Sequence, residues 1–192
     1  MMKGAVMLYM LTGEIQMGKT RWLERRVDEA RAAGIDVHGV LAPGVWRRLP
    51  GGGLEKVGID NALLPSGERI HLAVRRDLAR SAGREEARGP SERAGLGWAM
   101  SSAAVARVDA HFANLARAAG APSRRGLLVV DELGRLELIH GDGLVHALEL
   151  LRRGPQPAWE DAVVVVRRDL LDRAHEALDT AWPAVAHIVP PG

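Results

Sequence analysis

The chain has 192 residues, which is enough for one well-cored domain with a small addition. An apolar share of 47% and a charged share of 26% are ordinary for a globular protein, and a net charge of +2 gives little support for a nucleic-acid partner. The absence of cysteine excludes disulfides and thiolate metal sites. The apolar run at the N-terminus is too short to cross a bilayer and has no cleavage site, so we expect a cytoplasmic protein without a membrane partner. We also expect a monomer.

The first predicted element is a strand at residues 5–12, a continuous apolar run typical of a strand buried on both faces. The stretch LTGEIQMGKTRW (residues 11–22) comes next and fits the pattern G-x-x-x-x-G-K-[S/T], which is met by Gly13, Gly18, Lys19 and Thr20. Apolar residues then recur at helical spacing as far as Gly34, which is suited to capping a helix. A strand, a glycine loop and a helix in this order predict a phosphate-binding loop.

In such a loop the backbone N–H groups point at the phosphates of a nucleotide, and the helix N-terminus adds a partial positive charge. We expect Lys19 to reach the β- and γ-phosphates and Thr20 to ligate Mg²⁺. Only 3 of the 26 basic residues are lysine, so a lysine here indicates a place where a planar guanidinium will not serve. The predicted nucleotide-binding residues are Gly13, Glu14, Ile15, Gln16, Met17, Gly18, Lys19, Thr20 and Arg21.

A second short strand is expected at residues 36–42, followed by a pair of antiparallel hairpins within 43–74. Glycine and proline residues typical of turns divide residues 43–74 into short apolar stretches. The segment 81–95 has almost no large apolar residues, so we expect it to be mobile. A helix should begin near Ser102.

Helices alternate with three further predicted strands in the rest of the chain, at 126–131, 161–167 and 184–189. We expect Asp169 to cap the helix that follows the second of these strands. Nearly all-apolar strands that alternate with helices predict a parallel α/β sheet. We therefore expect residues 1–192 to form a single domain, in which 43–74 is a β-hairpin insertion and 81–95 a mobile loop.

Two acids, Asp131 and Glu132, end the strand at 126–131. Parallel α/β sheets place their ligands at the carboxyl ends of strands, so Asp131 can hold Mg²⁺ through water, and we predict Thr20 and Asp131 as the metal site. A nucleotide kinase excludes water from the γ-phosphate, whereas a hydrolase needs a carboxylate that orients and deprotonates a water molecule. The pair therefore favours hydrolysis, with Glu132 as the base.

The octet DELGRLEL (residues 131–138) resembles the D-E-[I/L]-G-x-[M/L]-E-L signature of the thermophile-type, or cancer-related, nucleoside-triphosphatase family of small P-loop NTPases. The resemblance covers nearly the whole chain, including the glycine-marked insertion. It implies a RecA-like P-loop NTPase core, with a five-stranded, mainly parallel sheet flanked by helices and an antiparallel β-hairpin insertion. It also implies Mg²⁺-dependent hydrolysis of ATP, GTP and other triphosphates. The residues that match the family's motifs are Gly13, Gly18, Lys19, Thr20, Asp131, Glu132, Gly134 and Glu137.

The chain departs from the family's pattern at two places. The family usually has G-P-P-G-x-G-K-T-T in the loop, where this chain has Glu14, Ile15, Gln16 and Met17 between the glycines and Arg21 after the threonine. Glu14 would repel a triphosphate if it pointed inward, so we expect it to point outward. The family often has Thr-x-His or His-Arg at the end of the next strand, where this chain has Arg167 and Arg168.

The candidate catalytic residues are Glu132, Lys19, Glu137, Arg167 and Arg168. In the RecA-like order one of the two arginines could face the γ-phosphate, or both could be solvated with Asp169 as a salt partner. Glu137 could orient water or Mg²⁺, or it could cap the segment that follows. Trp22 and Trp46 could stack on a base, although packing is the simpler explanation for both.

The sequence therefore favours a slow, Mg²⁺-dependent hydrolase of nucleoside triphosphates with loose base selectivity, because nothing in it resembles a dedicated base-reading motif. Two alternatives stay open. One is a small-molecule or nucleotide kinase that uses residues 81–95 as a lid. The other is a nucleotide-dependent switch whose hairpin, with Arg47 and Arg48, acts on a protein or RNA partner.

Overall fold

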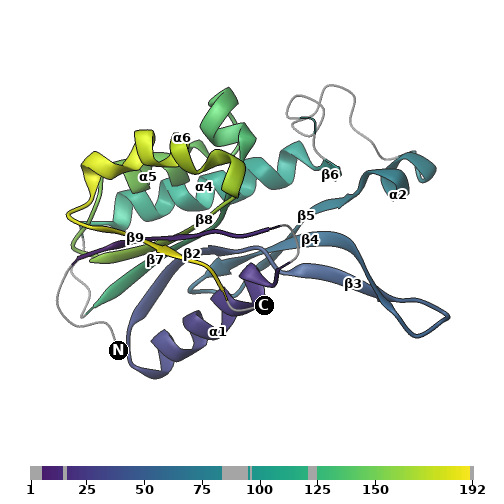
Figure 1. The fold of residues 1–192 in the computed structure, drawn as a ribbon, viewed down its shortest axis with the longest axis horizontal. Helices are drawn as coiled ribbons and strands as arrows, with labels where there is room; N and C mark the ends of the chain where they lie inside the picture. Colours follow the sequence, from purple (N-terminus) through teal and green to yellow (C-terminus); the bar gives the residue numbers. More distant parts are fainter. Residues whose placement is uncertain (1–5, 15–16, 84–94, 96, 121–124, 191–192) are drawn as a thin grey trace.

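Nine strands of the described chain form one mixed sheet (Figure 1). The structure, a computed structural model, describes residues 6–14, 17–83, 95, 97–120 and 125–190. The strands are β1 (Leu8–Leu11), β2 (Asp36–Leu41), β3 (Gly44–Arg48), β4 (Leu54–Leu64), β5 (Arg69–Arg75), β6 (Trp98–Met100), β7 (Gly126–Leu133), β8 (Asp161–Val166) and β9 (Val185–Ile188). Their order is β6-β5-β4-β2-β7-β8-β1-β9, and β3 pairs with β4 beside this path.

The five strands β2, β7, β8, β1 and β9 pair in parallel, which confirms the predicted parallel sheet. β8 lies between β1 and β7, as the RecA-like order requires. Successive residues of these strands point to opposite faces of the sheet. Leu8 and Met10 therefore pack into the core on one face, and Tyr9 and Leu11 pack into the core on the other.

Helices cover both faces of the parallel strands (Figure 1). α1 (Lys19–Ala32) lies on one face, where its Leu23 and Val27 are buried. The opposite face carries α4 (Ser102–Ala118), α5 (Val145–Arg152) and α6 (Leu171–Leu178). The shorter helical segments are α2 (Arg76–Ser81), the π-helix η1 (Leu136–His140) and the 3₁₀ turns η2 (Arg168–Leu170) and η3 (Asp179–Ala181). None of the helices in the described residues combines the length and the apolarity that crossing a membrane requires.

The antiparallel hairpins predicted for residues 43–74 are present, and together with β6 they extend the five predicted parallel strands to nine strands among the described residues. β4 pairs antiparallel with β2 through Gly39–Leu64, Val40–Leu63 and Leu41–Ala62, and β5 and β6 extend the sheet further. β2 ends the parallel set and would otherwise present a row of unpaired backbone groups, which β4 satisfies. The hairpins therefore continue the main sheet and do not form a separate subdomain.

The predicted helix cap at Asp169 is absent, and the predicted mobile loop lies mostly outside the described residues. Asp169 was expected to cap a helix, but it lies inside the 3₁₀ turn η2, and α6 begins at Leu171. The predicted mobile loop at 81–95 falls mainly on residues 84–94, which lie outside the described residues. Residues Arg76–Ser81, just before this loop, form α2, a helix that was not predicted from the sequence.

Candidate functional site

The loop between β1 and α1, which is the predicted phosphate-binding loop, leads directly into the start of a helix. Gly18 precedes α1 with φ +79°, a left-handed conformation that glycine adopts without strain. As a glycine it contributes no side-chain oxygen to cap the first N–H groups of the helix, which leaves them to a ligand. The Lys19 ammonium donates to the carbonyl oxygens of Gly13 at 3.0 Å and Glu14 at 2.7 Å, which holds it over the loop. Ile15 and Gln16 lie outside the described residues.

The two predicted metal ligands meet at the end of β7. The Thr20 hydroxyl lies 3.5 Å from Oδ1 of Asp131, and the backbone N–H of Ala42 donates to Oδ2 at 2.9 Å. Asp131 is buried, and this burial raises the pKa of its carboxyl to about 6, against the lowering effect of the Ala42 and Thr20 hydrogen bonds. One carboxylate oxygen is thus fixed by the backbone, while the other faces the hydroxyl.

Asp131 and Glu132 both line the same cavity, although neighbours in a regular strand point to opposite faces. The register of β7 against β8 shifts between Val130 and Leu133, and such an irregularity re-aims side chains. Glu132 stays accessible to water inside the cavity. The protein around it nevertheless raises the pKa of its carboxyl to about 7, mainly through desolvation and then through the charge of Asp131, while Lys19 and Arg167 oppose the shift.

Glu137 is buried, and both of its carboxylate oxygens accept backbone hydrogen bonds. Gly134 donates to one oxygen at 2.8 Å and Leu144 donates to the other at 2.9 Å. Gly143 has φ +78°, and a Cβ at this position would run into the Glu137 carboxylate. These contacts tie the segment that follows Glu132 into one loop, as in the capping alternative.

The two arginines after β8 have different surroundings. Arg167 lines the cavity and lies 3.5 Å from Asp169, whereas Arg168 is exposed and donates to Glu14 at 3.1 Å. Glu14 is exposed as well and thus points outward. Only Arg167 of the pair is therefore placed to act inside the cavity.

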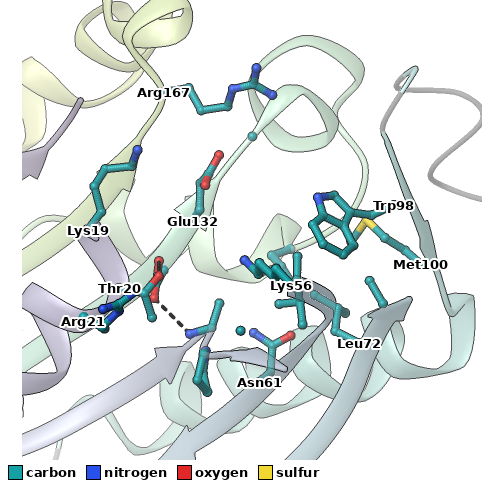
Figure 2. Close-up of a pocket in the computed structure, with 18 of the residues that line it drawn as sticks. Lys19, Thr20, Arg21, Lys56, Asn61, Leu72, Trp98, Met100, Glu132 and Arg167 are labelled. Carbon is teal, nitrogen blue, oxygen red and sulfur yellow. Dashed lines mark hydrogen bonds between the residues drawn. The ribbon is translucent and has the colours of Figure 1, made fainter. Parts of the chain in front are cut away.

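The cavity has a volume of about 820 Å³ and joins the phosphate-binding loop to the antiparallel strands. Figure 2 shows Lys19 and Thr20 on one side and Trp98, Leu72 and Met100 on the other. Glu132 and Lys56 lie between these two groups. A volume of this size is typical of small-molecule and cofactor sites.

Comparison with solved structures places this arrangement in a known fold. The chain is similar to the crystal structure of THEP1 from the hyperthermophile Aquifex aeolicus, with a TM-score of 0.63 over 95% of this chain and 88% of that chain. The chain shares the THEP1 fold. Sequence identity to THEP1 is 16%, so the likeness establishes the fold and leaves the chemistry to the residues of the site. No protein-family model matches the chain, and no curated protein matches it in sequence.

Within the THEP1 fold, the cavity also includes residues that the sequence did not predict for the site, and three of them have side chains suited to ligand binding. They are Lys56 and Asn61 on β4 and Trp98 on β6. The scarcity of lysine was a signal for Lys56, because the same argument that selected Lys19 applies to it. Asn61 and Trp98 carried no signal, since only the antiparallel pairing brings them together.

The two tryptophans considered for base stacking also differ. Trp22 packs against the core between α1 and the sheet, with the Arg26 guanidinium 5.4 Å from its ring centroid. Trp46 lines the cavity, is 44% exposed and lies under the Arg21 guanidinium at 5.8 Å. Packing therefore accounts for Trp22, while Trp46 is free to contact a ligand.

Proposed function

We propose that this protein hydrolyses nucleoside triphosphates to the diphosphate and phosphate, slowly, with Mg²⁺ and with loose base selectivity. The observation that carries the proposal is the strand order β1-β8-β7, which brings Lys19 and Thr20 to the same cavity as Asp131 and Glu132. Triphosphate hydrolysis needs a loop that binds the phosphates, two oxygen ligands for Mg²⁺ and a base that activates water.

The donor set fits Mg²⁺. Magnesium prefers oxygen ligands and is usually held by one or two carboxylates together with substrate phosphates and waters. Thr20 and Asp131 supply a hydroxyl and one carboxylate, and no group of three or more His, Cys, Asp or Glu suited to a metal occurs in the described residues. When bound, Mg²⁺ would be held by Thr20 and Asp131 and would offset the negative charge of the phosphate oxygens.

In the proposed reaction, the loop N–H groups and the Lys19 ammonium bind the phosphates and hold the γ-phosphoryl group toward Glu132. The Glu132 carboxylate orients a water molecule and takes its proton as the water oxygen bonds to the γ-phosphorus. The bond from phosphorus to the β–γ bridging oxygen then breaks. Arg167 adds positive charge at this end of the cavity.

The test is phosphate release from ATP, GTP, CTP and UTP with and without Mg²⁺, together with nucleotide-binding titrations. Lys19→Ala should abolish both binding and release, because the ammonium contacts the phosphates in the ground state and in the transition state. Arg25→Ala is the matched control, since it removes an exposed cation from the same helix. Equal activity of Lys19→Ala and Arg25→Ala would contradict the proposal.

A second candidate function, phosphoryl transfer to a small molecule, is favoured by the extent of the cavity past Glu132 to Trp98. In that reaction an acceptor hydroxyl would take the place of water, its oxygen bonding to the γ-phosphorus and its proton passing to Glu132. Phosphate release that falls while a phosphorylated acceptor accumulates would distinguish transfer from hydrolysis.

A further inference from the structure

The half of the cavity beyond Glu132 has a composition that phosphate binding does not explain. Its walls include Ile59, Leu72, Ala73, Trp98 and Met100, which are apolar, and they come from β4, β5 and β6. Figure 2 places Leu72, Trp98 and Met100 across the cavity from Lys19 and Thr20. A triphosphate is anionic throughout its phosphate chain, so these walls suit another kind of group.

The position of this apolar half fixes which molecule can occupy it. Lys19 and Glu132 define the γ-phosphate end of a bound triphosphate, and β2 and β4 continue the sheet from β7 toward Trp98. The base of the same triphosphate lies at the far end from its γ-phosphate. Figure 2 places Glu132 between Lys19 and Trp98, so a group on the Trp98 side of Glu132 lies on the side from which the γ-phosphorus is attacked. This position favours a second molecule as the occupant.

Asn61 is a polar residue in this half of the cavity, and its side chain has unmet hydrogen-bonding capacity. It is 1% exposed and lines the cavity, and its side-chain oxygen has no hydrogen-bond partner among the described residues. A buried amide oxygen without a partner is destabilising, and a ligand N–H that reaches it removes that cost. The carboxamide presents an acceptor and donors side by side, which matches the edge of a heterocycle with ring or exocyclic N–H groups.

Trp98 and Lys56 favour a flat ligand that carries a hydrogen-bond acceptor. The Lys56 ammonium lies 5.3 Å from the centroid of the Trp98 ring, where it partly neutralises the charges of Asp131 and Glu132. The indole offers a flat surface for stacking, and the ammonium offers a donor to a ring nitrogen or carbonyl. Enzymes that act on an unstacked base recognise it by stacking together with hydrogen bonds to its edge, and Trp98 and Asn61 in the same cavity can supply both.

We propose that this half of the cavity binds the base of a nucleoside as a second ligand, stacked on Trp98 and hydrogen-bonded at its edge to Asn61. The inference rests on the proposed function, because the position of the γ-phosphate is taken from Lys19 and Glu132. It goes beyond that function by assigning a ligand class to residues on β4 and β6 that hydrolysis does not use.

The test is binding of adenosine, guanosine, cytidine and uridine to the whole chain, measured calorimetrically with Mg²⁺ and a non-hydrolysable ATP analogue present. At least one nucleoside should bind, Asn61→Ala should weaken it about 10-fold, and Trp98→Leu at least about 5-fold. Asn114→Ala and Trp22→Leu are matched controls away from this half of the cavity and should bind as wild type. Circular dichroism and thermal unfolding of each variant exclude loss of the fold.

Three outcomes would overturn the inference: no nucleoside binds, the Asn61 and Trp98 variants bind like their controls, or indole binds as tightly as the nucleosides. Weaker binding of the ATP analogue itself to Asn61→Ala would also overturn it, since the occupant would then be the triphosphate's own base. Lys19→Ala separates the two proposals, because it should lose triphosphate binding and keep nucleoside binding. Phosphate release by wild type without any nucleoside binding would leave the proposed function standing alone.

Discussion

Replacing Gly143 with alanine should destabilise the protein through Glu137. Alanine in the left-handed conformation costs about 1–2 kcal/mol. At Gly143 the new Cβ also meets the Glu137 carboxylate, whose two oxygens accept the backbone hydrogen bonds from Gly134 and Leu144. Losing one hydrogen bond to a charged group costs a further ~1.5–3 kcal/mol, so the total should reach roughly 3–5 kcal/mol.

Gly67→Ala is the matched control, because Gly67 has φ +75° and open space around its missing Cβ. It should show the conformational cost alone, so urea unfolding should separate the two variants by about 1.5–3 kcal/mol, and their Tm values by about 3–12 °C. In a Glu137→Gln background the cost of Gly143→Ala should shrink, since the contact it disrupts is already weakened. Equal unfolding midpoints for Gly143→Ala and Gly67→Ala would refute the assignment of Glu137 as the residue that fixes this loop.

Four other variants test the site and the core. Glu132→Gln should bind a triphosphate normally but hydrolyse it about 10²–10⁴-fold more slowly in single-turnover assays, and unchanged hydrolysis would show that it is not the base. Arg167→Ala should lower the rate about 10²–10³-fold while Arg168→Ala has little effect, and equal rates for both would refute a role for Arg167 inside the cavity. Burial lowers the pKa of His38 below its usual 6.5, so the unfolded state binds its proton first, and stability should fall as the pH drops through 6.5. His38→Gln should remove this part of the pH dependence in urea unfolding at pH 5 to 8, and identical profiles would contradict the expectation.

The parts of the site that sequence could predict are those written in contiguous motifs. Gly13, Gly18, Lys19 and Thr20 lie within eight residues, and a run of apolar residues marks the strand that ends in Asp131. Local patterns of this kind fix a loop and a strand end without knowledge of tertiary contacts. The RecA-like order of β1, β8 and β7 then followed from the resemblance, and the structure confirms it.

The remaining parts depend on pairings between distant segments. Trp98 reaches the cavity because β6 pairs with β5, which pairs with β4, and no spacing in the sequence encodes that order. Strand alternation alone would have separated Asp131 from Glu132, and the shift in register that unites them has no sequence signal. Arg167 and Arg168 could not be told apart, because their difference comes from Glu14 on a loop 154 residues away.

β2 and β4 pair over only three residue pairs, and this pairing joins the parallel part of the sheet to its antiparallel part. The residues that we propose to act on phosphate lie on the parallel side, on β7, after β8 and at the start of α1, whereas Asn61 and Trp98 lie on the antiparallel side. Substitutions on β4 to β6 can thus alter the shape and polarity of one compartment while the machinery around Lys19 keeps its geometry. We therefore expect a change of small-molecule preference to require substitutions on the antiparallel strands only, with the residues around Lys19 retained.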